Sequence, residues 1–116
     1  MTTNKRVLLI GETNGDLQPH APRWELHIAA NLTAALGIYV FHFPNVIVID
    51  GKVSFAPDAL LHLRSVDAAP IILLTDKPQC WQLPDDGAVI VLDPATDAAA
   101  LVRRIHHLTA PRIVQR

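Results

Sequence analysis

The stretch that decides the fold is Pro44-Asn45-Val46-Ile47-Val48-Ile49-Asp50. Its four apolar residues from Val46 to Ile49 are typical of a parallel strand that is covered on both faces. The strand ends in a single carboxylate, that of Asp50. In open parallel sheets, ligand binding and chemistry collect at the carboxyl ends of the strands. The stretch therefore predicts a buried strand with a candidate functional residue at its end.

Three further apolar runs also lead into polar residues. They are Val7 to Ile10 before Gly11-Glu12, Ile71 to Leu74 before Thr75-Asp76, and Ala88 to Leu92 before Asp93-Pro94. Because the carboxyl ends of parallel strands meet at one edge of a sheet, these polar residues predict a shared acidic site. The alternative is that the same residues begin loops and cap the following helices, as acidic residues often do.

The segment before the central stretch has two interpretations. Asn31 is a typical N-cap for a helix that runs from Leu32 to about Phe43. The aromatic and β-branched residues from Ile38 to Phe41 also favour a strand. We favour the helix because the two residues Pro44-Asn45 are too few to connect two parallel strands.

The remaining patterns complete an alternation of strands and helices. We expect a first strand from Arg6 to Ile10, and the alternating residues Trp24 to Ile28 predict an edge strand. Pro57 suits the first turn of a helix that continues to Val66. Thr96 or Asp97 caps a last helix from Ala98 to about Leu108. The chain thus predicts an α/β fold, in the form of a flavodoxin-like three-layer sandwich. Its five-stranded parallel sheet would have the order 2-1-3-4-5.

Length and charge restrict the class of protein. The 116 residues fit one domain, residues 1–116, which can bury a core without disulfides. Half of the residues are hydrophobic, and 10 basic residues balance 11 acidic ones, for a net charge of −1. This balance gives no strong field toward nucleic acids or anionic lipids. We expect neither as a partner.

Cysteine and histidine usage argues against a metal framework of the common kinds. The single Cys80 excludes an internal disulfide and gives no zinc spacing. The six histidines lack the spacing of zinc proteases, so we expect them to be surface or partly buried residues.

The polar start from Met1 to Arg6 does not resemble a signal peptide, and no apolar run reaches about eighteen residues. We expect a cytoplasmic protein.

The order of the segments resembles the receiver domain of two-component response regulators, the CheY-like family. Residues Ile28 to Asp50 resemble its second strand, second helix and third strand, which ends in the phosphate-accepting aspartate. Pro70 to Thr75 resembles the fourth strand with its phosphate-contacting hydroxyl residue. Gly87 to Pro94 resembles the fifth strand and the turn after it. The resemblance covers nearly the whole chain, but the first and fourth helices would be shortened, in Gly11 to Arg23 and Asp76 to Asp86.

The resemblance implies a receiver-like domain of two-component signal transduction that acts through protein–protein contacts. Asp50 would be the candidate phosphoacceptor and Thr75 the hydroxyl residue that faces the phosphoryl group. Glu12 and Asp50 would bind Mg²⁺ weakly. The implied partners are a histidine kinase, an output protein or a second copy of the chain. We do not expect the chain to be an enzyme in its own right.

The chain also departs from the family pattern. Gly11-Glu12 supplies one acidic residue where the family has two, and Asp93 stands where the family has a lysine that pairs with the phosphoryl group. Two charges about 4 Å apart interact with about 1 to 4 kcal/mol in wet surroundings, so Asp93 opposes phosphorylation. Lys52 or Lys77 could compensate. Ile90 occupies the region of the family's switch aromatic residue. These departures imply an atypical receiver or a pseudo-receiver.

Two further questions remain open in the sequence. A small flavodoxin-like ligand-binding or enzymatic domain could use the same acidic crevice, formed by Glu12, Asp50, Asp76 and Asp93. Against it, the chain has no nucleophile–base pair and no phosphate-cradling glycine loop.

Shortened helices would also expose the sheet unless a partner or second copy covers it. Trp24 and Trp81 are candidate covers, and the alternative is that each packs locally.

Overall fold

The computed structural model describes residues 6–11, 24–65, 69–81 and 89–109. These ranges contain five strands, three α-helices and one 3₁₀ helix. In chain order they are β1 (Arg6–Ile10), β2 (Glu25–Ala29), α1 (Leu32–His42), β3 (Val46–Asp50), α2 (Ala56–Ser65), β4 (Ile71–Leu74), η2 (Pro78–Cys80), β5 (Val89–Leu92) and α3 (Ala98–Thr109).

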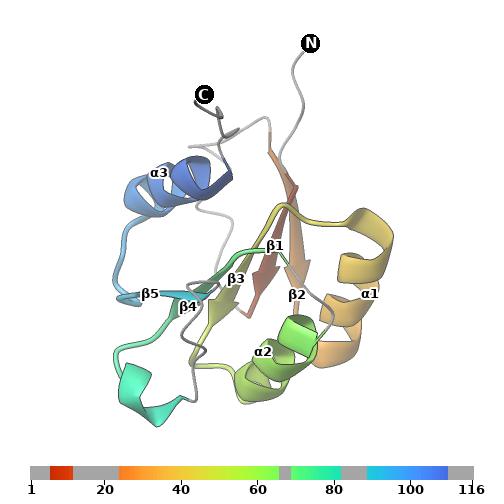
Figure 1. Ribbon diagram of the computed structural model, residues 1–116, viewed down its shortest axis with the longest axis horizontal. Helices are drawn as coiled ribbons and strands as arrows, with labels where there is room; N and C mark the ends of the chain where they lie inside the picture. The colour runs from red at the N-terminus through yellow and green to blue at the C-terminus, as the bar shows by residue number, and fades with distance from the viewer. Residues whose placement is uncertain (1–5, 12–23, 66–68, 82–88, 110–116) are drawn as a thin grey trace, which may run out of the picture.

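The five strands form one sheet in the order β2-β1-β3-β4-β5, and all four neighbouring pairs are parallel. Helices α1 and α2 lie on one face of this sheet and α3 lies on the other (Figure 1). The predicted strand order and the predicted three-layer, flavodoxin-like arrangement are therefore confirmed. None of the helices in the described ranges combines the length and the apolar character that a membrane span requires.

The position of β3 between the two helical layers explains why Val46 to Ile49 are all apolar. Ile47 and Ile49 pack in the layer under α1 and α2, whereas Val46 and Val48 pack in the layer under α3. All four are fully buried. Burying such a side chain contributes about 1.5–3 kcal/mol, so both layers of the core depend on this strand.

The favoured helical interpretation of the segment before β3 is confirmed. The side chain of Asn31 accepts a hydrogen bond from the Ala34 amide at 2.8 Å, which caps the start of α1. The helix continues to His42, so the alternative strand from Ile38 to Phe41 is wrong. Phe43 then adopts a left-handed conformation with φ of 48° and ends the helix.

Strand β2 lies at the edge of the sheet, as predicted, but it begins and ends one residue later than expected. The last helix begins at Ala98, and Asp97 is its cap, because its Oδ1 accepts a hydrogen bond from the Ala100 amide at 2.8 Å. Thr96 instead donates its hydroxyl hydrogen to the Asp93 carbonyl at 2.6 Å.

The proline-rich segments fall mostly outside the described residues. The first, Gly11 to Arg23, is described only at Gly11. The second, Asp76 to Asp86, is described to Trp81 and contains η2. The shortening of the corresponding helices therefore stays a prediction. Trp24 and Trp81 are half-buried and pack against the two core layers, in agreement with local packing.

Candidate functional site

The register of the sheet brings most of the predicted site residues to one edge. Asp50, the last residue of β3, pairs with Leu74 of β4, and Leu74 pairs with Leu92 of β5. Thr75 and Asp93 follow these two residues directly. Asp50, Thr75 and Asp93 therefore share the carboxyl edge of the sheet, as their sequence positions predicted. Glu12, the predicted Mg²⁺ ligand after β1, lies outside the described residues.

Asp50 is partly exposed and is held against the end of β1. Gly11 has a φ of 116°, and a Cβ atom there would lie 2.7 Å from the Asp50 Cβ and 3.1 Å from a methyl carbon of Val53. The Gly11 amide donates a hydrogen bond to the Ala29 carbonyl at 3.0 Å, which fixes this close approach. A glycine is required here because it tolerates the positive φ and leaves room for Asp50.

Gly51 and Thr75 form a second close approach at the same edge. The Gly51 amide donates to the Leu74 carbonyl at 2.9 Å, and the Thr75 amide donates to the Leu92 carbonyl at 3.0 Å. A Cβ atom at Gly51 would lie 2.7 Å from the Leu74 carbonyl oxygen, 3.2 Å from the Thr75 Cβ and 3.4 Å from the Trp81 ring. The backbone at the end of β3 is therefore closely packed against the end of β4.

Each polar side chain at this edge also organises its own turn. Asp50 Oδ1 accepts the Lys52 amide at 3.0 Å, Thr75 Oγ1 accepts the Lys77 amide at 3.1 Å, and Asp93 Oδ1 accepts the Ala95 amide at 2.7 Å. Hydrogen bonds to the amide two residues ahead are typical of Asx and Ser/Thr turns. The alternative that these residues begin loops is thus correct for all three, and it does not exclude a further role.

The two carboxylates at this edge, those of Asp50 and Asp93, have different surroundings. Asp93 is exposed, and its carbonyl also accepts the Thr96 amide at 3.0 Å, so Asp93 organises the connection between β5 and α3. Within the described ranges, no ion pair joins the side chain of Lys52 or Lys77 to Asp50. Compensation for Asp93 by either lysine stays a prediction.

Asp50 fits the coordination chemistry of Mg²⁺, which uses one or two carboxylates and retains several waters. A carboxylate has about four lone-pair sites, and the Lys52 amide uses one of them. The partly exposed Asp50 can therefore contact a cation and solvent together.

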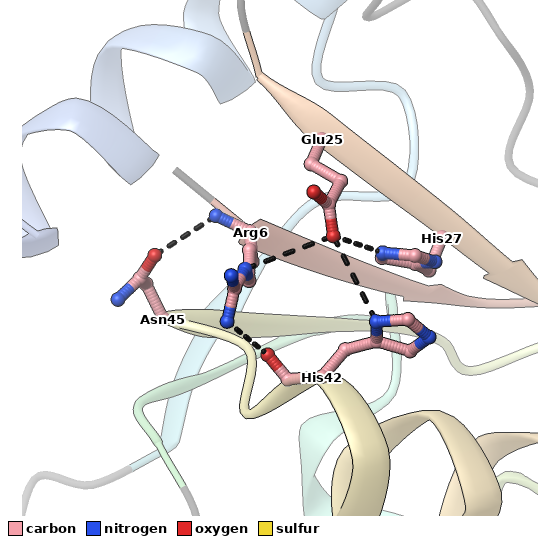
Figure 2. Close-up of polar contacts among 5 residues, drawn as sticks. All are labelled: Arg6, Glu25, His27, His42 and Asn45. Atoms are coloured by element: carbon pink, nitrogen blue, oxygen red, sulfur yellow. Dashed lines mark hydrogen bonds and ion pairs between the residues drawn. The ribbon is translucent and has the colours of Figure 1, made fainter. Parts of the chain in front are cut away.

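A second polar cluster lies at the other end of the strands, near their amino ends, around Glu25 at the start of β2 (Figure 2). Glu25 Oε2 lies 2.6 Å from His27 Nε2, 3.7 Å from Arg6 Nε and 3.9 Å from His42 Nδ1. The hydrogen bond with His27 lowers the pKa of Glu25 below its usual value, and the charges of His27, Arg6 and His42 act in the same direction.

Sequence reasoning missed this cluster. The alternation Glu25-Leu26-His27 on a strand places the first and third side chains on one face, which is a local signal. His42 belongs to another element, at the end of α1, and no spacing rule connects it to β2. Only the packing of α1 against β2 brings the three side chains together.

Comparison with known proteins identifies the fold. No protein-family model matches the chain. No curated protein matches it either. Among solved structures, it resembles the chemotaxis response regulator CheY4 of Vibrio cholerae, with 16% identity and a TM-score of 0.68 over 91% of this chain and 99% of that one. It also resembles the receiver domain of the Francisella response regulator 1452, with 18% identity and a TM-score of 0.71 over 91% and 97%.

A pseudo-receiver is also similar to this chain. The pseudo-receiver domain of CikA has 18% identity and a TM-score of 0.59 over 93% of this chain and 99% of that one. The response regulator PhyR of Brucella abortus has 15% identity and a TM-score of 0.69 over 92% of this chain. This chain spans only about half of PhyR, 48% of its length. These likenesses show that the fold is that of receiver domains.

Proposed function

We propose that this chain is a receiver-like signalling domain of the two-component type, with Asp50 as its phosphoacceptor. The observation that carries the proposal is the position of Asp50. It is a partly exposed carboxylate at the carboxyl end of β3, the middle strand of a sheet with the receiver strand order. Its partial exposure would let a partner's phosphohistidine approach the carboxylate.

The hydrogen bonds at the edge support a division of roles. Asp50 would attack the phosphorus atom with a carboxylate oxygen, and the partner's imidazole would leave. Thr75 Oγ1 already accepts the Lys77 amide, so its hydroxyl hydrogen is available to donate to a phosphoryl oxygen. Mg²⁺, bound by Asp50 and Glu12, would neutralise charge on the phosphoryl oxygens. Lys52, whose amide already binds Asp50, would supply the positive charge that Asp93 does not. We propose that the chain is not an enzyme in its own right.

Asp93 makes this receiver an atypical one. A carboxylate at the usual position of a lysine would repel a phosphoryl group on Asp50. We therefore propose weak or short-lived phosphorylation, and output through contact with a kinase, an output protein or a second copy. The large apolar side chains of Val40, Phe41 and Phe43 are 58%, 80% and 69% exposed, and exposed apolar groups of this size often mark protein contacts.

Intact-mass spectrometry after incubation with acetyl phosphate and Mg²⁺ tests the phosphoacceptor. We expect one phosphoryl adduct, absent from Asp50→Ala and present in the matched control Asp58→Ala, which changes an exposed aspartate in the first turn of α2. An adduct that persists in Asp50→Ala would place the acceptor elsewhere. The absence of any adduct from the wild type would leave a pseudo-receiver that signals without phosphorylation.

A thermal-shift experiment separates this proposal from a metabolite-binding domain. A ligand that binds only the folded state raises the melting temperature. We expect stabilisation by Mg²⁺ with beryllofluoride, a phosphoryl mimic, and none by nucleotides or flavins. Stabilisation by a nucleotide or flavin alone would contradict the receiver function.

A further inference from the structure

Glu25, His27 and His42 form a compact set of metal-ligating side chains outside the Asp50 site. One ligand atom from each lies within 4.8 Å of the others. Glu25 and His27 share the face of β2 to which Ala29 belongs, and Ala29 packs in the layer under α1. His42 is the last residue of α1 and completes the set (Figure 2).

We propose that these three side chains bind one Zn²⁺ ion. Two imidazoles and one carboxylate are a donor set that suits Zn²⁺ and other late transition metals, whereas Mg²⁺ takes oxygen ligands. Three protein ligands leave the fourth position of a tetrahedral ion for a water molecule. The site is independent of phosphoryl chemistry, because Glu25 pairs with Arg6 at the start of β1 and Asp50 lies at the end of β3. About five residues of strand, or about 16 Å, separate Glu25 from the level of Asp50 along the strands.

The distances require only small movements. Ligand atoms in a tetrahedral zinc site with bonds of about 2.0–2.2 Å lie about 3.4 Å apart. Glu25 Oε2 is 2.6 Å from His27 Nε2 and 3.9 Å from His42 Nδ1, so these two separations bracket the required value. The third separation, between the two histidines, is at most 4.8 Å, so it also has to shorten by no more than about 1.4 Å. The side chains of Glu25, His27 and His42 are 41%, 22% and 44% exposed, which lets an ion reach them from solvent.

The surroundings hold the set in place. The imidazoles of His27 and His42 stack with centroids 4.2 Å apart and planes at 25°. Arg6 donates from Nη1 to the His42 carbonyl at 3.0 Å, and its backbone amide donates to Asn45 Oδ1 at 2.8 Å. These contacts fix the end of α1 against β1, in the way that outer-shell hydrogen bonds orient metal ligands.

Arg6 also opposes the ion. Its guanidinium Nε lies 3.7 Å from Glu25 Oε2, so a positive charge already occupies one side of the carboxylate. The competing interpretation is an ion-pair network of Arg6, Glu25 and a protonated histidine, with no metal.

The test uses the full chain, prepared without a histidine tag and stripped of metal by a chelator. Calorimetric titration with ZnCl₂ at about pH 7.5 should give one ion per chain. The melting temperature of the protein should rise when Zn²⁺ is added. Excess Mg²⁺ should not displace the bound Zn²⁺. Replacing a ligand costs at least as much as replacing an outer-shell partner, so we expect His27→Gln, His42→Gln and Glu25→Gln to weaken binding by about 100-fold or more.

Two controls separate the proposal from its alternatives. His107→Gln changes an exposed histidine on α3, on the other face of the sheet, and should leave the affinity unchanged. In the wild type, imidazole ¹⁵N resonances of His27 and His42 should shift on adding Zn²⁺ while those of the other four histidines stay in place. This measurement needs no variant to fold. Absence of binding, equal loss in His107→Gln, or one ion per two chains would overturn the site.

Discussion

Gly11 is the residue at which backbone conformation most directly constrains the candidate phosphoacceptor. Its φ of 116° and the 2.7 Å approach to the Asp50 Cβ leave no room for a side chain. We expect Gly11→Ala to destabilise the protein by about 1–3 kcal/mol, because a strained backbone and a displaced Asp50 must both be accommodated. Urea unfolding gives the free energy, and the phosphoryl adduct reports the displacement.

Gly37 supplies the matched control. It lies inside α1, and a Cβ atom there would meet nothing within 4 Å. Gly37→Ala should therefore stabilise the protein by up to about 1 kcal/mol, since alanine is the better helix former. If both glycine variants lost the same stability, the close approach at Gly11 would not be the reason.

Asp93 is the residue that we expect to limit phosphorylation of Asp50. We expect Asp93→Lys to increase the phosphoryl adduct, because repulsion becomes attraction. Asp93→Asn removes the charge but keeps the acceptor for the Ala95 amide, so it should give an intermediate yield with an intact turn. Mass spectrometry of all three proteins under one acetyl phosphate treatment measures the order. Equal yields would show that Asp93 does not act on Asp50.

At the scale of elements, the end of α1 contains a correctable strain. Phe43 adopts a φ of 48°, and its ring is exposed, so the left-handed conformation gains little packing in return. Phe43→Gly should raise the free energy of unfolding by about 0.5–1 kcal/mol, because glycine adopts this C-cap conformation without the Cβ penalty. Chemical unfolding measures the change. Phe43→Ala removes the ring but keeps the Cβ, and a gain as large as that of the glycine variant would assign the effect to the ring.

The elements that the sequence predicted well are those with local signals. The buried run Val46 to Ile49 and the cap at Asn31 depend on residues next to one another, and both are confirmed. The choice between Thr96 and Asp97 as a cap required the hydrogen bond to Ala100, because both residue types suit that position. The bounds of β2 were predicted one residue too early, because its alternating pattern alone does not show where an edge strand begins and ends.

At the scale of the whole molecule, the two edges of the sheet differ in how visible they were in the sequence. Asp50, Thr75 and Asp93 each follow an apolar run, so the parallel topology alone places them together. The cluster of Glu25, His27 and His42 depends on how α1 packs across the edge strand. That packing is set by side-chain volume and helix geometry, which no residue spacing records.

The stability of the whole protein should depend on pH through Glu25. Folding lowers the pKa of Glu25 from its ordinary value of 4.5, so the unfolded chain binds more protons near that pH. The stabilising contribution is therefore complete well above pH 4.5 and is lost as the pH falls through the lower, folded value. Melting temperatures of the wild type and Glu25→Gln, measured in metal-free buffer, should differ most near neutral pH and converge in acid. A difference that stays constant down to the acid range would mean that the ionised carboxylate of Glu25 contributes no net stability, and that the ion-pair network around it is only a surface contact.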